Sequence, residues 1–134
     1  MLIYIASSYK NMHGVSQLEA TLGAQGHTIL SWLKNNEQHK TGSPVFEKWV
    51  ETDDAFSCFV YDTKAAMTAD LVIYYGPSGP DAWAEIGAAF GAQSPVIIGL
   101  RAPGEQIGLM RNMVSSWFNS IPELLSFVNL LAQR

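Results

Sequence analysis

The sequence predicts a flavodoxin-like α/β sandwich of three layers, with helices on both faces of a five-stranded parallel sheet in the strand order 2-1-3-4-5. Two β-branched apolar runs, Leu71 to Tyr75 and Val96 to Ile98, flank a segment with helical spacing and so form a βαβ unit. Both runs are apolar throughout, which is typical of strands covered on both faces. Along the chain, the expected order of elements is βαβαβαβ(α)βα, which favours the doubly wound arrangement.

The first half of the chain begins with an apolar run, Leu2 to Ala6, that we expect to form a buried central strand. A helix follows, and Gly23 or Gly26 ends it. Its apolar face consists of Val15, Leu18 and Leu22. Residues 27–32 predict a second strand.

A polar segment from Lys34 to Pro44 is the longest loop that we expect, and loops of this length are often functional lids. His39, within this loop, is expected at the surface. Helical spacing then continues from Val45 to Thr68 as one or two helices, with a break near Thr52, which would cap the second.

After the βαβ unit, the pattern predicts three further elements. We expect a short helix at 106–113, a fifth strand at 114–118 and a terminal helix at 122–132, whose start is marked by Ser120 or Pro122. The inward face of the terminal helix consists of Leu124, Leu125, Val128 and Leu131. The core face of the helix inside the βαβ unit consists of Ala82 or Trp83, Ile86, Ala89 and Phe90.

Composition limits the classes of function. A chain of 134 residues with 48% hydrophobic and 15% charged residues suits one globular domain. A net charge of −4 argues against a nucleic-acid partner, and no apolar run approaches the roughly 18 residues of a membrane span. The single cysteine, Cys58, is expected to fill the core, and it favours a reducing, cytoplasmic compartment without disulfides. We find no signal segment and no ligand set for a metal, and we expect no cofactor.

The helix of the βαβ unit carries two acids at the edge of the sheet where open α/β folds bind ligands. With Gly79 or Ser78 as the cap and Pro80 in the first helical position, Asp81 and Glu85 lie one turn apart beside the crevice. The alternative is that both acids only complement the positive end of the helix dipole.

Other polar residues are expected near the same edge. Ser7, Ser8 and Tyr9 follow the first strand, where hydroxyl groups suit a phosphate or a sugar; alternatively, one serine only caps the next helix. Asp62 lies inside a predicted helix, so it either faces solvent or meets Glu85 across the crevice.

Four segments together resemble one known family. They are Ile-Tyr-Ile-Ala-Ser-Ser at 3–8, Asp62 followed by Ala-Asp-Leu-Val-Ile at 69–73, Pro-Ser-Gly at 77–79 with Ala-Glu-Ile-Gly-Ala-Ala at 84–89, and Ser-Pro-Val-Ile-Ile at 94–98. They resemble motifs of the nucleoside 2-deoxyribosyltransferase superfamily, which includes the 2′-deoxynucleoside 5′-phosphate N-hydrolases. The resemblance implies that residues 1–134 form a single domain of this type, which cleaves or transfers the N-glycosidic bond of a nucleoside or its 5′-monophosphate.

The resemblance also implies roles for the site residues. Glu85 would attack the anomeric carbon or stabilise an oxocarbenium ion, and Asp62 would move a proton to the leaving base or from water. Ser7, Ser8 and Ser78 would hold the 5′ group, next to Gly79. A base would stack on Tyr4, Tyr9 or Trp83.

Asp81 and Asn112 are two further candidates for substrate binding, and the resemblance bears on them in different ways. The sugar-binding aspartate of the transferases lies six residues before the glutamate, whereas Asp81 lies four residues before Glu85. The superfamily borrows site residues from a neighbouring subunit, so the resemblance implies a homo-oligomer, and Asn112 is the candidate for that exchange. The remaining alternatives are a nucleotide-binding module without turnover and another nucleotide N-glycohydrolase, of the nicotinamide-dinucleotide or phosphoribohydrolase type.

Overall fold

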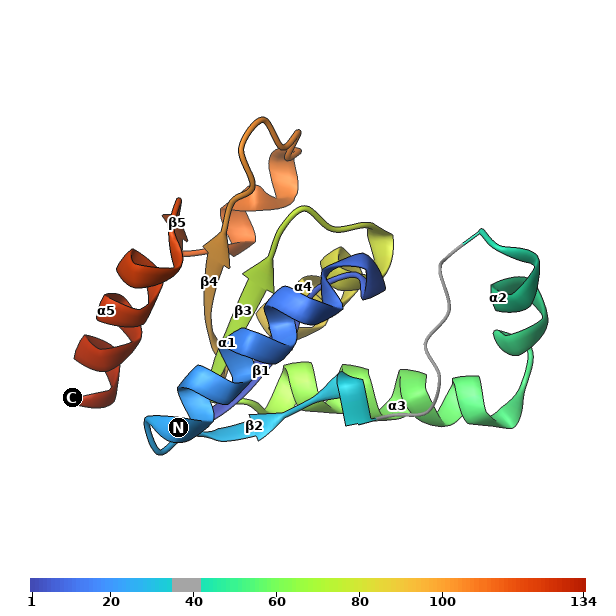
Figure 1. Ribbon diagram of the computed structural model, residues 1–134, viewed down its shortest axis with the longest axis horizontal. Helices are drawn as coiled ribbons and strands as arrows, with labels where there is room; N and C mark the ends of the chain where they lie inside the picture. The colour runs from blue at the N-terminus through green and yellow to red at the C-terminus, as the bar shows by residue number, and fades with distance from the viewer. Residues whose placement is uncertain (35–41) are drawn as a thin grey trace.

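The computed structural model, which describes residues 1–34 and 42–134, contains a five-stranded parallel sheet (Figure 1). The strands are β1 (Leu2–Ala6), β2 (Thr28–Leu30), β3 (Leu71–Tyr75), β4 (Val96–Leu100) and β5 (Ser116–Phe118), and their order is β2-β1-β3-β4-β5. The predicted fold class and strand order are therefore confirmed.

Helices cover both faces of this sheet. The α-helices are α1 (Met12–Ala24), α2 (Pro44–Trp49), α3 (Asp53–Thr68), α4 (Pro80–Ala92) and α5 (Ile121–Ala132). Short 3-10 helices are η1 (Tyr9–Asn11), η2 (Trp32–Lys34) and η3 (Leu109–Met113). Figure 1 shows α1 in front of the sheet and α4 behind it, and α4 packs along α3.

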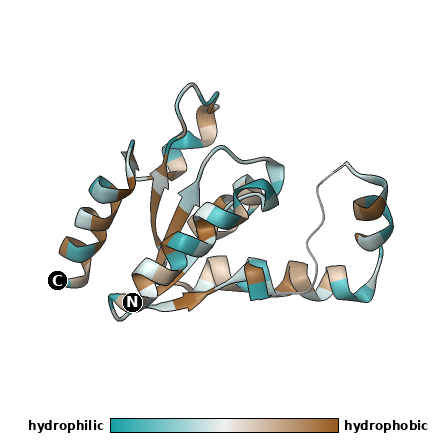
Figure 2. Cartoon of the chain, in the orientation of Figure 1, coloured by the Kyte–Doolittle hydropathy of each residue, from teal (hydrophilic) through white to brown (hydrophobic). Residues whose placement is uncertain are grey.

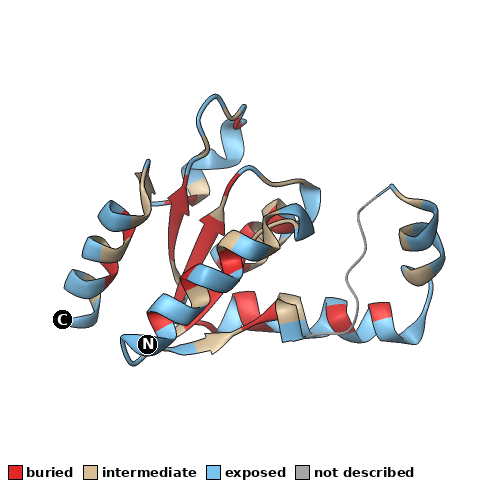
Figure 3. Ribbon diagram, in the orientation of Figure 1, coloured by how far each residue is buried: buried red, intermediate tan, exposed pale blue. Residues whose placement is uncertain are grey.

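The core lies between the central strands and the helices. Nearly every residue of β1 and β3 is buried (Figure 3), and the central strands are coloured as hydrophobic in Figure 2. Burial on both faces explains why these strands are apolar throughout instead of alternating. From the helices, Val15, Leu22, Ile86 and Leu124 complete the core with no exposed surface.

Side-chain caps set the helix boundaries. Thr52 accepts a hydrogen bond from the Ala55 N–H at 3.2 Å, so the helical segment predicted at 45–68 divides into α2 and α3 at the expected break. In the same way, the Ser120 hydroxyl accepts from the Glu123 N–H at 3.4 Å where α5 begins. Gly79 is the N-cap of α4 and Pro80 its first residue, as one of the two expected arrangements requires.

Some sequence expectations were wrong in detail. The second strand ends at Leu30, because Trp32 turns into η2, where its indole N–H donates to the Ile5 carbonyl at 2.8 Å. The short helix expected at 106–113 covers only Leu109–Met113. Phe90, expected in the core, is 55% exposed, since the stripe of α4 that packs on the sheet is made of smaller residues.

The longest predicted loop, from Lys34 to Pro44, overlaps the gap between the described residues 1–34 and 42–134. Its middle, including His39, lies outside the described residues. Across residues 1–34 and 42–134, no helix has the length and apolarity needed to cross a membrane.

The N-cap of α3 offers a test of local stability. We expect Thr52→Ala to lower the free energy of unfolding by about 1 kcal/mol, because the Ala55 N–H loses its acceptor. The measurement is urea unfolding at a fixed protein concentration. Thr63→Ala, inside the same helix, is the control and should cause no loss. Equal stability of Thr52→Ala and the wild type would contradict the assigned cap.

Candidate active site

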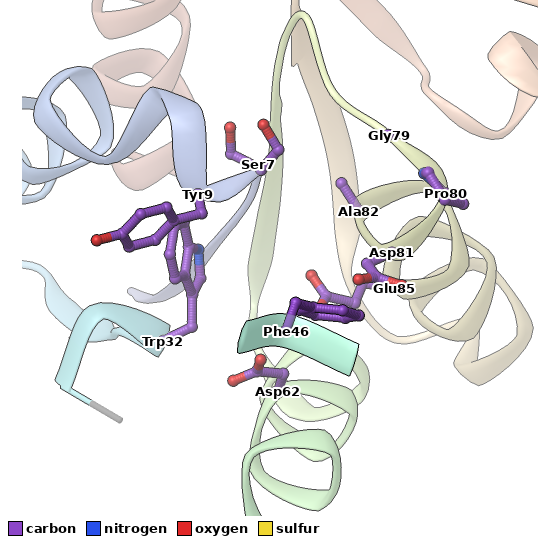
Figure 4. A pocket seen from close by; sticks show the side chains of 11 residues that line it. Ser7, Tyr9, Trp32, Phe46, Asp62, Gly79, Pro80, Asp81, Ala82 and Glu85 are labelled. Atoms are coloured by element: carbon purple, nitrogen blue, oxygen red, sulfur yellow. The ribbon is translucent and has the colours of Figure 1, made fainter. Parts of the chain in front are cut away.

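A cleft of about 90 Å³ opens at the carboxyl edge of β1, beside the start of α4 (Figure 4). Its lining residues come from the loop after β1, from η2, and from α2, α3 and α4. They are Ser7, Ser8, Tyr9, Trp32, Phe46, Asp62, Gly79, Pro80, Asp81, Ala82 and Glu85. The cleft therefore lies where ligands bind in doubly wound folds.

Most of the residues singled out from the sequence meet in this cleft, but Ser78, Asn112 and two of the stacking candidates, Tyr4 and Trp83, do not line it. Ser78 belongs to the adjoining turn, and its hydroxyl oxygen is buried without a hydrogen-bond partner. Asn112 lies exposed in η3, where its side-chain amide donates to the Leu109 carbonyl at 2.9 Å.

Glu85 enters the cleft because of the way α4 packs. Ala82, Ile86 and Ala89 form the buried stripe of the helix, and Glu85 lies directly beside this stripe. The hydroxyl group of Tyr4, on the central strand β1, donates to Glu85 Oε1 at 2.9 Å. The carboxylate is thus held between the helix and the sheet.

Asp62 reaches the same cleft from α3. It lies four residues after the buried Cys58 and four before the buried Ala66, so helical periodicity places it on the inner face of α3. Figure 4 shows its carboxylate below Glu85 in the cleft. Of the two placements that the sequence left open, the structure has the one in which Asp62 lines the same cleft as Glu85.

The surroundings of Glu85 raise its pKa to about 8. Burial is the largest cause, and the nearby charge of Asp62 is the second. The hydrogen bond from Tyr4 acts in the opposite direction, because it stabilises the ionised form. At neutral pH Glu85 is therefore mostly protonated.

Three aromatic residues line the cleft, and two of them were not expected there. Figure 4 shows Tyr9 and Trp32 together on one side and Phe46 nearer to Glu85. Sequence reasoning assigned Trp32 to a strand and Phe46 to the apolar spacing of a helix, so neither was connected with a ligand. The indole of Trp32 is fixed by its bond to the Ile5 carbonyl.

The other two candidates for base stacking serve different purposes. Tyr4 is fully buried and holds Glu85, so its ring is not available to a ligand. The ring of Trp83 packs on Tyr74, with 4.6 Å between the centroids, and Trp83 does not line the cleft. Among the three expected stacking residues, only Tyr9 remains.

Polar contacts join the loops after β1 and β3. Ser7 Oγ donates to the Tyr75 carbonyl at 2.8 Å, and Asn11 Nδ2 donates to Ser7 Oγ at 3.0 Å and to the Pro77 carbonyl at 2.7 Å. Ser8 Oγ is buried without a hydrogen-bond partner. Its donor and acceptor capacity is therefore available to a ligand.

The described residues offer no ready metal site. Within 1–34 and 42–134, no group of three or more His, Cys, Asp or Glu side chains is arranged to hold an ion.

The chain is similar to known proteins in its structure. No protein-family model matches the sequence, and no curated protein matches it. The fold is similar to that of a 2-deoxyribosyltransferase from Bacillus psychrosaccharolyticus, with a TM-score of 0.67 and 21% identity over 92% of this chain and 90% of that one. It is also similar to that of the CMP N-glycosidase of Clostridium botulinum, with a TM-score of 0.62 and 24% identity over 97% of this chain and 99% of that one.

The fold and the cleft define a doubly wound α/β domain with two carboxylates at the carboxyl edge of its sheet. Over nearly its whole length, this domain has the fold of the two matched enzymes. The fold implied by the sequence resemblance is therefore present.

The two influences on Glu85 have opposite signs and are testable. We expect Tyr4→Phe to raise the Glu85 pKa above about 8, because the carboxylate loses a donor, and Asp62→Asn to lower it, because a negative charge is removed. Carbon-detected NMR titration of the Glu85 carboxyl group measures both shifts. Tyr75→Phe, remote from Glu85, is the control. Shifts of the same sign in the two variants would contradict this description.

Proposed function

We propose that this chain is an enzyme that cleaves or transfers the N-glycosidic bond of a nucleoside or its 5′-monophosphate, with Glu85 as the nucleophile. The observation that carries the proposal is the placement of Glu85 in the cleft, with Tyr4 bonded to it and Asp62 beside it. The shared fold supports it, because both matched enzymes are described by N-glycosidic chemistry on nucleosides or nucleotides.

The proposed chemistry starts at the anomeric carbon of the sugar. As the C1′–N bond breaks, its electron pair leaves with the base, and C1′ gains positive charge. The carboxylate of Glu85 attacks C1′ and forms a glycosyl ester, which water or an acceptor base then displaces. Glu85 gives up its proton before it attacks, and that proton passes through Asp62 to the leaving base. The growing positive charge at C1′ favours ionised Glu85, which offsets its raised pKa of about 8.

Asp62 is the proposed proton carrier. A proton on the leaving base lowers the cost of breaking the C1′–N bond, and a base must later remove a proton from water. The charge of Asp62 raises the Glu85 pKa and so favours one proton on the two acids. One proton between the two carboxyl groups would provide an acid and a nucleophile from the same two side chains.

Other residues that line the cleft would bind the 5′ group, the sugar and the base of the substrate. Ser7, Ser8 and the start of α4 near Gly79 would hold the 5′ group through hydroxyls and backbone N–H groups, since no Lys or Arg is among the described lining residues. Asp81 is the proposed partner of a sugar hydroxyl. The base would stack among Tyr9, Trp32 and Phe46, which all line the cleft.

Removing the Glu85 carboxylate tests the proposal. We expect Glu85→Gln to reduce base release by a factor on the order of 10³ or more, because an amide forms no stable glycosyl ester, while thermal unfolding shows an intact fold. Chromatography follows base release from deoxynucleosides and their 5′-monophosphates. The control is Glu123→Gln, an exposed glutamate on α5.

The same assay separates the alternatives. Release without an acceptor base indicates a hydrolase, and exchange with an added base indicates a transferase. Binding without release by the wild-type protein would contradict the enzyme proposal and favour a nucleotide-binding module. Full activity of Glu85→Gln would remove the nucleophile assignment.

We further propose that the chain forms a homo-oligomer through α3 and α4. An apolar groove of about 520 Å³ lies between α2, α3 and α4. It contains Phe56 and Phe59, which are 65% and 60% exposed. Large exposed aromatic side chains gathered in one groove are typical of interaction surfaces.

A second copy of this chain is the proposed occupant of the groove. Asp62, Asp81 and Glu85 border both the groove and the cleft, so a chain seated there would lie beside the proposed reaction centre. On α4, Gly87 and Gly91 have open space where side chains would stand, which allows a helix to approach closely. We assign Asn112, on η3, to the residues that one copy lends to another.

Disrupting the groove should change the mass of the protein in solution. We expect Phe59→Asp to shift the wild-type oligomer to the monomer, because a buried unpaired charge opposes association. Size-exclusion chromatography with light scattering gives the mass. Leu130→Asp, on α5 and 65% exposed, is the control. A wild-type monomer at all concentrations would contradict the proposed interface.

A further inference from the structure

The side chain of Glu105, which lies in the segment after β4, reaches over the turn between β3 and α4. Its Oε2 accepts a hydrogen bond from the Tyr74 hydroxyl, and its Oε1 accepts one from the Ala102 N–H at 3.1 Å. A Cβ at Gly76 would collide with this carboxylate. Glu105 therefore packs directly on the backbone of the turn, and its carboxylate occupies the space that a Cβ at Gly76 would need.

The partner of Glu105 is itself firmly placed. Tyr74 is fully buried, and its ring packs against Trp83 of α4 and Trp117 of β5 at centroid distances of 4.6 and 5.7 Å. Burial and the bond to Glu105 raise the pKa of Tyr74, so its hydroxyl remains a donor. Glu105 thus ties the turn to a rigid aromatic cluster.

The opposite side of the turn is held by other residues. Asn11 Nδ2 donates to the Pro77 carbonyl at 2.7 Å, from the side of β1. Glu105 acts from the side of β4, whose Leu100 carbonyl also accepts from the Gly76 N–H at 3.0 Å. The turn is therefore clamped from two sides before it delivers Gly79 to the cleft.

We infer that Glu105 is a positioning residue that sets the place of the Gly76–Gly79 turn against the 5′ end of the substrate. It does not line the cleft, and both carboxylate oxygens are engaged with protein groups. The inference rests on the proposed function, since it requires a nucleoside or nucleotide in the cleft.

The loss of the Glu105 contacts should change KM and not kcat, because Glu85 is held by other residues. Tyr4 and the buried stripe of α4 hold Glu85 independently of Glu105. A displaced turn should weaken contacts to the non-reacting 5′ end equally in the ground state and the transition state. Such a loss raises KM and leaves kcat almost unchanged.

The test uses Glu105→Ala with the substrate that the wild-type protein cleaves fastest among the four common deoxynucleosides and their 5′-monophosphates. We expect KM to rise about tenfold, with kcat within about twofold of the wild type. Glu105→Gln keeps an acceptor for Tyr74, so its KM should lie much closer to that of the wild type. Glu123→Ala is the matched control, and urea unfolding is measured for every variant.

The outcomes separate the inference from the proposed function. An unchanged KM, or a fall in kcat alone, overturns the positioning role, because plain destabilisation reduces the active fraction without changing KM. If the wild type releases no base, the proposed function fails, and calorimetric titration with deoxycytidine 5′-monophosphate becomes the readout. A larger dissociation constant for Glu105→Ala than for the wild type then still supports the inference. Equal affinity of the two proteins, or no binding by the wild type, overturns it.

Discussion

The hydrogen bond between Tyr4 and Glu85 joins the centre of the sheet to helix α4, and the geometry of the cleft depends on it. A buried carboxyl group that lacks a partner is costly, and a hydrogen bond to it is worth roughly 0.5–1.5 kcal/mol, or roughly 1.5–3 kcal/mol once the group is ionised. Tyr4 supplies such a bond at 2.9 Å from a fully buried position on β1. Because its ring is locked in the core, the direction of the bond is fixed by the packing of the whole domain.

The same interaction explains how two acids coexist at one edge of the sheet. α4 contributes Glu85, and α3 contributes Asp62 from its inner face, so the packing of these two helices sets the distance between the charges. The burial of Glu85, and after it the repulsion between the two charges, raise the pKa of Glu85, whereas Tyr4 limits the rise. The titration of the site is therefore a property of three elements that are far apart in the sequence.

The strands, their order and the helix breaks could be predicted from the sequence, because they follow from apolar runs and from local caps such as Thr52 and Gly79. Sequence reasoning also identified the acids that the cleft brings together. It missed the role of Tyr4, since the partner of its hydroxyl lies 81 residues away. Trp32 was missed for a similar reason: its orientation depends on a carbonyl of another strand, and no local pattern indicates such a contact.

The burial of Glu85 has a consequence for the resting protein. With a pKa of about 8, this side chain spends most of its time at neutral pH as an uncharged acid, which is a poor nucleophile. Electrophiles that enter the cleft would therefore meet an uncharged acid group in place of a nucleophilic carboxylate. In the proposed reaction, Glu85 would ionise as positive charge develops at C1′, so low background reactivity would be combined with reactivity toward the substrate.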